Sequence, residues 1–242
     1  MYCALENHNE SEGYEYIRNL LLIEGNTIGN TKELSNVCIE ILSPTTKEIY
    51  FPNRKISENY AKAELNWYWS GSNSMEEIAQ HAKLWRKLSD DGITNNSAYG
   101  YIIHKKYGYD QLQKVIEILK FDPNSRRAVI NISDPTLDKK ETKDLQCTIA
   151  LQFLIRNGSL EMTVYMRSND IYFGFPYDYI YFVSLGEYVA YKLGIDFSVY
   201  THHATSMHMY LKDVDKFIPH SQISNLNVDE IIRRNYDATY KI

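Results

Sequence analysis

A cysteine, a glutamine and an arginine lie on two neighbouring stretches whose pattern predicts paired strands. Cys147 opens an apolar run that continues past Gln152, and Arg167 ends a second run that follows the Asn157-Gly158 pair. Asn-Gly between two such runs is a strong signal for a tight hairpin turn. Side chains on paired strands can converge on a polar ligand. One chemistry that this arrangement allows is a cysteine nucleophile beside a cation that binds an anionic substrate.

Plainer interpretations stay open when these residues are taken one at a time. An isolated cysteine is more often a small core residue than a nucleophile, and Arg167 alone is typical of a surface strand position. Alternate residues of a strand are expected to share a face. This periodicity groups Cys147 with Ile149, Leu151 and Phe153 on one face, and Thr148 with Ala150 and Gln152 on the other.

Further motifs extend the pattern along the chain. In order they are AELNWYWSGSN at 63–73, SAYG at 97–100, DPNSRRAVI at 122–130, Cys147 with Gln152-Phe153, RSND at 167–170, FGFPYD at 173–178 and MHMY at 207–210. Together they resemble the thymidylate synthase family over residues 58–210, and in particular its phage-type deoxycytidylate hydroxymethylases. The resemblance implies an α+β fold with a large mixed or antiparallel sheet, packed helices and a homodimer formed through the sheet.

The resemblance also implies a reaction. Cys147 would add to C6 of a pyrimidine nucleotide and make C5 able to attack 5,10-methylenetetrahydrofolate, which divides one difficult step into easier ones. Because an unperturbed thiol titrates near ~8.5, nearby positive charge is expected to favour the thiolate. Arg167 is the candidate for this role and would also bind the nucleotide phosphate. The implied co-substrate is a folate, and no metal is expected.

Two further residues match the family's proton-handling groups. Glu64 matches the glutamate that acts through water at C5 and at the pyrimidine edge, and Tyr99 matches a tyrosine of the same network. A general acid or base must reach its proton directly or through one water. Without the resemblance, Glu64 would be interpreted as an exposed helix residue, although its neighbours Ala63 and Leu65 make burial plausible.

The motifs imply a larger set of nucleotide-binding residues. Arg126 and Arg127 would reach the phosphate from the other subunit, although a solvated turn explains them equally well if the rest of the chain is ignored. His208 and Tyr210, two residues apart on an extended segment, match the pair that binds the sugar 3′-hydroxyl. The other members of the set are Gln152, Arg167, Ser168, Asn169, Asp170 and Gly174.

Asp178 bears on the choice of base. Synthases that use uracil carry asparagine here, whose amide donates to O4 and accepts from N3–H. Cytosine reverses both groups, and a carboxyl group can accept from its amine and, when protonated, donate to N3. An unpaired buried polar edge costs roughly 1–3 kcal/mol, which is enough to decide between bases. A plainer role, capping the helix expected from Tyr179, is compatible with this one.

Departures from the synthase pattern favour capture of water. Thr148 stands where most synthases have histidine, residues 90–98 lack the usual tryptophan and Gly-Pro pair, and NYDATYKI lacks the longer apolar tail that closes over folate. A synthase must exclude water so that folate can deliver hydride. We therefore predict 5-hydroxymethylation of dCMP or CMP, with the choice of sugar left open. The alternatives are a thymidylate synthase that methylates dUMP and a catalytically silent nucleotide-binding homologue.

The remaining sequence is typical of one globular domain, predicted to span 1–242. Hydrophobic residues make up 44%, and the net charge of −5 argues against a surface that coats nucleic acid or a membrane. Three widely spaced cysteines (Cys3, Cys38 and Cys147) predict neither a disulfide framework nor a zinc site. Without a signal peptide or a long apolar run, the cytoplasm is the expected location.

The elements that must position these residues follow from hydrophobic periodicity. Helices are predicted at 14–23, from 57, at 109–119, at 179–193 and after 209, and strands at 35–42, 128–132, 147–155, 160–166 and 197–203. This mixture predicts an α+β fold. His202 and His203 match no motif and are expected to be structural, and Arg54 is a candidate for the phosphate-binding arginine that the first 50 residues do not otherwise supply.

Overall fold

A large mixed sheet forms the base of the molecule. The computed structural model describes residues 2–7, 9–216 and 226–241, and only the backbone of 2–7. The sheet has eight strands in the order β1-β3-β8-β6-β5-β4, with β2 beside β3 and β7 beside β8. The strands are β1 Tyr2–Asn7, β2 Asn26–Ile28, β3 Thr31–Leu42, β4 Val129–Asn131, β5 Thr148–Arg156, β6 Ser159–Met166, β7 Asn169–Asp170 and β8 Phe197–Tyr210.

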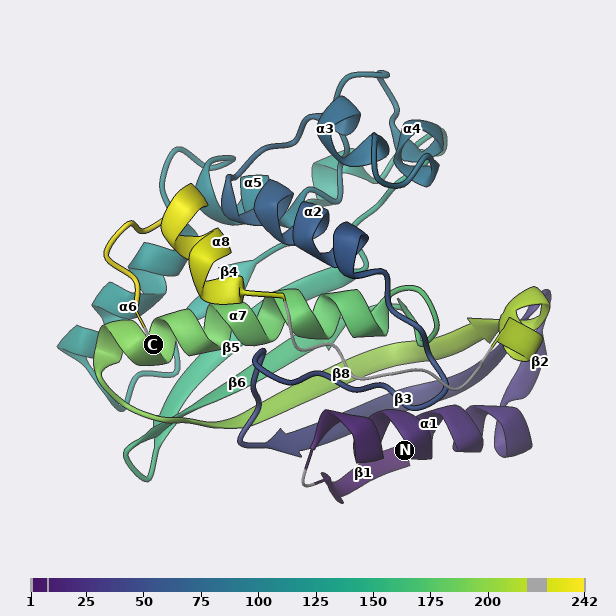
Figure 1. The fold of residues 1–242 in the computed structure, drawn as a ribbon, viewed down its shortest axis with the longest axis horizontal. Coiled ribbons are helices and arrows are strands. Elements are labelled where there is room, and N and C mark those ends of the chain that lie inside the picture. Colours follow the sequence, from purple (N-terminus) through teal and green to yellow (C-terminus); the bar gives the residue numbers. More distant parts are fainter. Residues whose placement is uncertain (1, 8, 217–225, 242) are drawn as a thin grey trace.

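Helices cover one face of this sheet. They are α1 Glu10–Glu24, α2 Glu58–Trp69, α3 Met75–Ala79, α4 Leu84–Leu88, α5 Tyr99–His104, α6 Gln111–Phe121, α7 Phe175–Leu193 and α8 Val228–Asn235, with 3-10 turns at Pro135–Leu137 and Leu211–Lys216. In Figure 1, α7 runs along the sheet, and α2 and α8 lie on the side of α7 that faces away from the sheet. The predicted α+β class, with a large mixed sheet and packed helices, is confirmed.

Helix α7 forms the centre of the core because it is apolar on almost every side. Its buried residues include Tyr179, Phe182 and Val189, each 0% exposed. A helix that is hydrophobic all round is stable in water only when other elements enclose it. The helix begins at Phe175, four residues before the predicted start, so Asp178 lies within its first turn.

The β5–β6 hairpin forms as predicted but contains a bulge. Its turn residues Asn157 and Gly158 have φ values of 52° and 81°, as a type I′ turn requires. The register between β5 and β6 shifts between Thr148 and Ala150. Consequently Thr148 is 0% exposed and faces the core, while Ile149 is 43% exposed. The predicted alternation, which grouped Ile149 with Leu151 and Phe153 and placed Thr148 opposite them, is wrong at this point because the extra residue reverses the faces.

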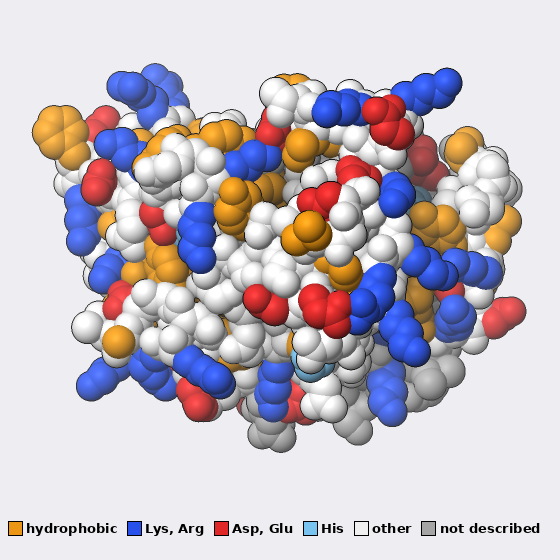
Figure 2. All heavy atoms as spheres, turned by 90° about the horizontal axis from the view of Figure 1, so that it is seen from above, with side chains coloured by type: hydrophobic (Ala, Val, Ile, Leu, Met, Phe, Trp, Pro, Cys, Tyr) orange, Lys and Arg blue, Asp and Glu red, His pale blue; other side chains and the backbone are white. Residues whose placement is uncertain are grey.

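Two parts of the surface are open to contact by other molecules. The face of the sheet that the helices leave uncovered, called the open face, carries Ile149 and Tyr165, which are 43% and 37% exposed. On the face seen in Figure 2, basic, acidic and apolar side chains are interspersed. Among the described helices, none combines the length and the apolar character needed to cross a membrane.

Candidate active site

Cys147 lies immediately before β5, in a segment that Arg167 fastens in place. Arg167 donates from Nε to the carbonyl of Gln146 (3.0 Å) and from Nη2 to that of Leu145 (2.8 Å). Its backbone N–H donates to the carbonyl of Cys147 at 2.8 Å. These bonds hold the guanidinium beside the cysteine, while much of the Arg167 side chain stays exposed. The predicted pairing of Cys147 with Arg167 is therefore present.

The surroundings of the Cys147 thiol oppose its ionisation. Burial raises the pKa of Cys147 to about 11, and the nearby carboxyl groups of Asp178, Asp144 and Asp170 add to this effect. Arg167 lowers the pKa, as expected, but its effect is smaller than that of burial. The predicted direction of the Arg167 effect is therefore present, but burial of the sulfur outweighs one cation, so the net shift of the pKa is upward.

Glu64 is the second reactive group of the site, and a hydrogen bond from Tyr60 fixes its position. The Cys147 cluster comprises Cys147, Glu64, Tyr99, Thr148 and Asp178. The Tyr60 hydroxyl donates to Glu64 Oε1 at 2.6 Å and accepts from the indole N–H of Trp85 at 2.9 Å. Burial raises the pKa of Glu64 to about 8, and the Tyr60 hydrogen bond only partly offsets this. A pKa near 8 lies close to neutral pH, which suits a group that gives up and regains a proton.

Two hydroxyl groups lie close to Cys147 on the side facing α5. Tyr99 opens α5, and its ring stacks on those of Tyr68 and Phe182 with centroids 5.5 and 5.9 Å away. Its hydroxyl lies near that of Thr148. Thr148 Oγ1 is buried and, apart from this contact with Tyr99, has no hydrogen-bond partner within the described part of the chain. A hydroxyl can both donate and accept, so it has capacity left for a substrate or a water molecule.

Asp178 faces the same cluster from the first turn of α7. It raises the pKa of Glu64, of Cys147 and of Tyr99, which places it near all three. Burial raises its own pKa to about 7. The carboxylate accepts from Asn169 Nδ2 at 2.7 Å. Gly174 is the N-cap of α7, so the suggested capping role of Asp178 is wrong.

Several residues predicted to bind the nucleotide lie on β8 and in the segment after β6. His208 and Tyr210 share one face of β8, with rings 5.5 Å apart, and Ser168 Oγ lies 3.4 Å from His208 Nδ1. Asp170 Oδ1 accepts from the backbone N–H groups of Tyr172 and Phe173, which closes the turn before α7. One oxygen of Asp170 therefore has a structural role.

Three predicted binding residues lie outside this cluster in a single chain. Gln152 is five residues along β5 from Cys147, roughly 16 Å away at the rise of a strand. Its amide donates to the Arg126 carbonyl at 3.2 Å and accepts from the Tyr165 hydroxyl at 3.3 Å. Arg126 and Arg127 follow α6, and both are exposed.

Arg54, the candidate phosphate ligand, is occupied elsewhere. It is 6% exposed, and its guanidinium lies 4.2 Å over the ring of Tyr172. It also donates to backbone carbonyls of Tyr172 and Lys55. These contacts fix the turn before α7 and leave Arg54 poorly suited to bind a phosphate.

Sequence reasoning missed Tyr60, Trp85 and His202. Tyr60 precedes Glu64 by four residues, a helical spacing that places side chains on the same face. His202 was expected to be structural, but its Nε2 lies 3.1 Å from Asn169 Oδ1 and so joins the group that contacts Asp178. Tyr200 and His202 alternate along β8 and face the same side, a signal that was available.

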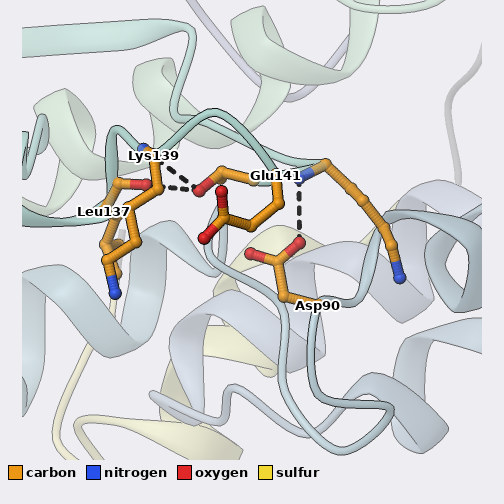
Figure 3. Close-up of a pocket in the computed structure, with 6 residues that line it drawn as sticks. Asp90, Leu137, Lys139 and Glu141 are labelled. Carbon is orange, nitrogen blue, oxygen red and sulfur yellow. Dashed lines mark hydrogen bonds between the residues drawn. The ribbon is translucent and has the colours of Figure 1, made fainter.

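A separate surface pocket of about 330 Å³ lies between Asp90 and the loop that contains Leu137, Lys139 and Glu141 (Figure 3). The backbone N–H of Lys143 donates to Asp90 at 2.8 Å across it. Residues of the Cys147 cluster do not line this pocket. It is therefore distinct from the candidate active site.

Comparison with known proteins identifies relatives of the whole arrangement. A family model described as thymidylate synthase matches residues 44–233. The chain is 36% identical over 200 residues to a protein of Methanocaldococcus jannaschii that is predicted to be a thymidylate synthase, covering 78% of this chain and 82% of that one. It is 33% identical over 195 residues to the deoxyuridylate hydroxymethyltransferase of Bacillus phage SP01, covering 75% of this chain.

A third relative acts on the other base. The deoxycytidylate 5-hydroxymethyltransferase of Enterobacteria phage T2 is 29% identical over 203 residues, covering 77% of this chain and 79% of that protein. The match spans about half (51%) of the Bacillus phage protein. The names of these relatives divide between hydroxymethyl transfer and thymidylate synthesis, and the hydroxymethyltransferases divide between deoxyuridylate and deoxycytidylate.

Proposed function

The chain belongs to the thymidylate synthase family of one-carbon transferases, and we propose that it hydroxymethylates C5 of a cytidine monophosphate, dCMP or CMP. The observation that carries this proposal is Asp178. Its carboxyl group, with a pKa raised to about 7 by burial, is protonated in a large fraction of molecules at neutral pH. A neutral carboxyl group offers one donor and one acceptor, which is what the N3 and 4-amino groups of cytosine require.

The residues of the cluster then have the following roles. Cys147 loses its proton as its sulfur bonds to C6, and the electrons of the C5–C6 double bond become available at C5. 5,10-Methylenetetrahydrofolate supplies the one-carbon group when it is bound. Glu64, protonated in the resting state, exchanges protons at C5 and at the base edge directly or through water. In the final step the bond between sulfur and C6 breaks and the thiol is restored.

The folate would bind where aromatic surface is exposed in the turn just before α7. Phe173 is 48% exposed, and its ring meets that of Tyr172 edge-on at 4.8 Å. An exposed aromatic face is suited to stacking on a flat heterocycle. The Thr148 hydroxyl, buried with no hydrogen-bonding contact but Tyr99 among the described residues, is suited to hold the water that becomes the new hydroxyl group.

A competition among dCMP, CMP and dUMP, with methylenetetrahydrofolate present and each product identified by mass, tests the proposal. We expect a cytidylate to gain one hydroxymethyl group and tetrahydrofolate to be released without oxidation. A methyl product with dihydrofolate would refute water capture. Conversion of dUMP alone would favour the second candidate, deoxyuridylate hydroxymethylation, which the Bacillus phage relative supports.

We further propose that two chains share their active sites. Arg126 and Arg127 are exposed and lie beside Gln152 on the open face of the sheet, so a partner packed on that face would receive them. Each site would then combine one chain's Cys147 with its partner's arginines.

A mixing experiment measures whether sites are shared. Cys147→Ala and the double variant Arg126→Ala/Arg127→Ala should each be inactive alone, because each lacks one half of every site. When the two are refolded together, mixed dimers should regain about a quarter of wild-type activity, because half the dimers are mixed and each of these contains one complete site. Absence of any recovery, with a dimer present by light scattering, would contradict the shared site.

A further inference from the structure

Three polar side chains behind the proposed base-binding carboxyl group, Asp178, form with it one continuous hydrogen-bonded network. The Tyr200 hydroxyl lies 2.8 Å from His202 Nδ1, and His202 Nε2 lies 3.1 Å from Asn169 Oδ1. Asn169 Nδ2 lies 2.7 Å from Asp178 Oδ2. Tyr200 and His202 are 0% exposed and Asn169 is 3% exposed. Because these three side chains are closed off from solvent, they must find their hydrogen-bond partners among one another and among neighbouring protein groups.

The surroundings fix which group donates and which accepts in each hydrogen bond of this network. Within the described residues, His202 Nδ1 is the hydrogen-bond partner of the Tyr200 hydroxyl, which must therefore donate to it. Burial lowers the pKa of His202 to about 3, so the ring is neutral and carries one proton. With Nδ1 accepting, that proton is on Nε2 and is donated to Asn169 Oδ1. The amide nitrogen of Asn169 must then face Asp178.

As a result, the two carboxyl oxygens of Asp178 have different hydrogen-bonding roles. Oδ2 accepts from Asn169, so a proton on this group resides on Oδ1. A pyrimidine therefore meets one donor and one acceptor in a fixed order. Cytosine and uracil present these groups in opposite order, and a wrongly ordered pair leaves two buried polar groups unsatisfied. If the Asn169 amide turned over, Asp178 would donate its proton from Oδ2 to the amide oxygen and Oδ1 would become an acceptor, so the donor that N3 of cytosine needs would be lost.

Gly174 leaves the space that this arrangement needs. A Cβ atom at position 174 would lie 2.9 Å from Asn169 Nδ2 and 3.3 Å from Asp178 Oδ2. The first of these distances is shorter than side-chain carbon atoms adopt. A glycine at the start of α7 thus allows the Asn169–Asp178 hydrogen bond to form.

We infer that His202, acting through the amide of Asn169, is a positioning residue that fixes the donor and acceptor sides of Asp178 and so determines which pyrimidine is accepted. This inference rests on the proposed function, because it assumes that Asp178 meets the base. His202 itself does not touch the substrate. Its role is to prevent the amide from turning over.

Two substitutions of the same histidine separate positioning from packing. His202→Leu removes the donor, so the amide is free to turn, and the ratio of kcat/KM for cytidylate to that for uridylate should fall about tenfold or more. His202→Gln keeps an N–H that can donate to Asn169 Oδ1, and should keep the ratio within about threefold of wild type. Tyr179→Phe, which changes a buried tyrosine packed on Tyr200, is the matched control and should leave the ratio unchanged.

The ratio, and not activity alone, decides the outcome. If His202→Leu lowers kcat/KM for both bases by the same factor, the histidine is only structural and the inference is overturned. If circular dichroism shows that His202→Leu does not fold, the same measurement is made on Tyr200→Phe instead. Without the hydroxyl, His202 can move its proton to Nδ1, so the ratio should again fall, and an unchanged ratio would overturn the inference. Failure of the proposed function would instead appear in the wild type, as no turnover of any cytidylate.

Discussion

Replacing Asp178 by asparagine is expected to reverse the base preference, changing the kcat/KM ratio of cytidylate to uridylate by roughly 10²–10⁴. An amide at this position donates through its nitrogen and accepts through its oxygen without needing a proton, and it suits the O4 and N3–H groups of uracil. Two mismatched buried hydrogen bonds at about 1–3 kcal/mol each produce a change of this size.

The measurement is kcat/KM for dCMP and for dUMP in the wild type and in Asp178→Asn. Glu187→Gln is a matched control, since Glu187 is a half-buried carboxyl group on the same helix that accepts from the backbone N–H and the hydroxyl of Thr46, away from the site. It should keep the wild-type ratio. Equal losses on both bases in Asp178→Asn would show that Asp178 does not choose the base.

Replacing Cys147 by serine is expected to lower turnover by at least about 10⁴, because the reaction would lose its covalent step. A serine hydroxyl ionises far less readily than a thiol and cannot form the C6 adduct at a useful rate. Binding of the nucleotide should change only a few-fold, since Arg167 and the sugar-binding residues remain.

Release of tritium from C5 of labelled nucleotide measures this loss directly, because the exchange requires the adduct. Cys38→Ser is the control, since Cys38 lies on β3 and pairs in register with His203, away from the cluster. It should exchange tritium at the wild-type rate. If the wild type itself released none and Cys147→Ser bound nucleotide equally well, the chain would be a nucleotide-binding protein without this activity.

Much of the fold could be predicted because its signals are local. The Asn157-Gly158 turn and the amphipathic stretches of α1, α2 and α6 are patterns of neighbouring residues. The short strands β1 and β2 lack such a pattern, and they form because β3 offers them a pairing edge. The bulge at Ile149 was missed for a related reason, since its position depends on how β5 meets both of its neighbours.

The candidate site, like the fold, could be predicted from the sequence only in part. Motif order was enough to bring Cys147, Arg167 and Asp178 together. The pKa of Cys147 could not be predicted from Arg167 alone, because it depends on how deeply the sulfur is buried and on three carboxyl groups from other segments. The orientation of the Asn169 amide depends on His202, more than 30 residues away in sequence and adjacent only after β7 and β8 align.

The neutral carboxyl groups of Glu64 and Asp178 also couple the stability of the enzyme to pH. Each holds its proton more tightly in the folded chain than in the unfolded one, so its favourable contribution to the free energy of unfolding is complete below about pH 4. That contribution is lost as the pH rises through about 7 and 8, the folded values of Asp178 and Glu64. The protein is therefore expected to be less resistant to unfolding in mildly alkaline solution than in mildly acidic solution, and the proposed nucleotide, when bound, would offset this weakness by mass action.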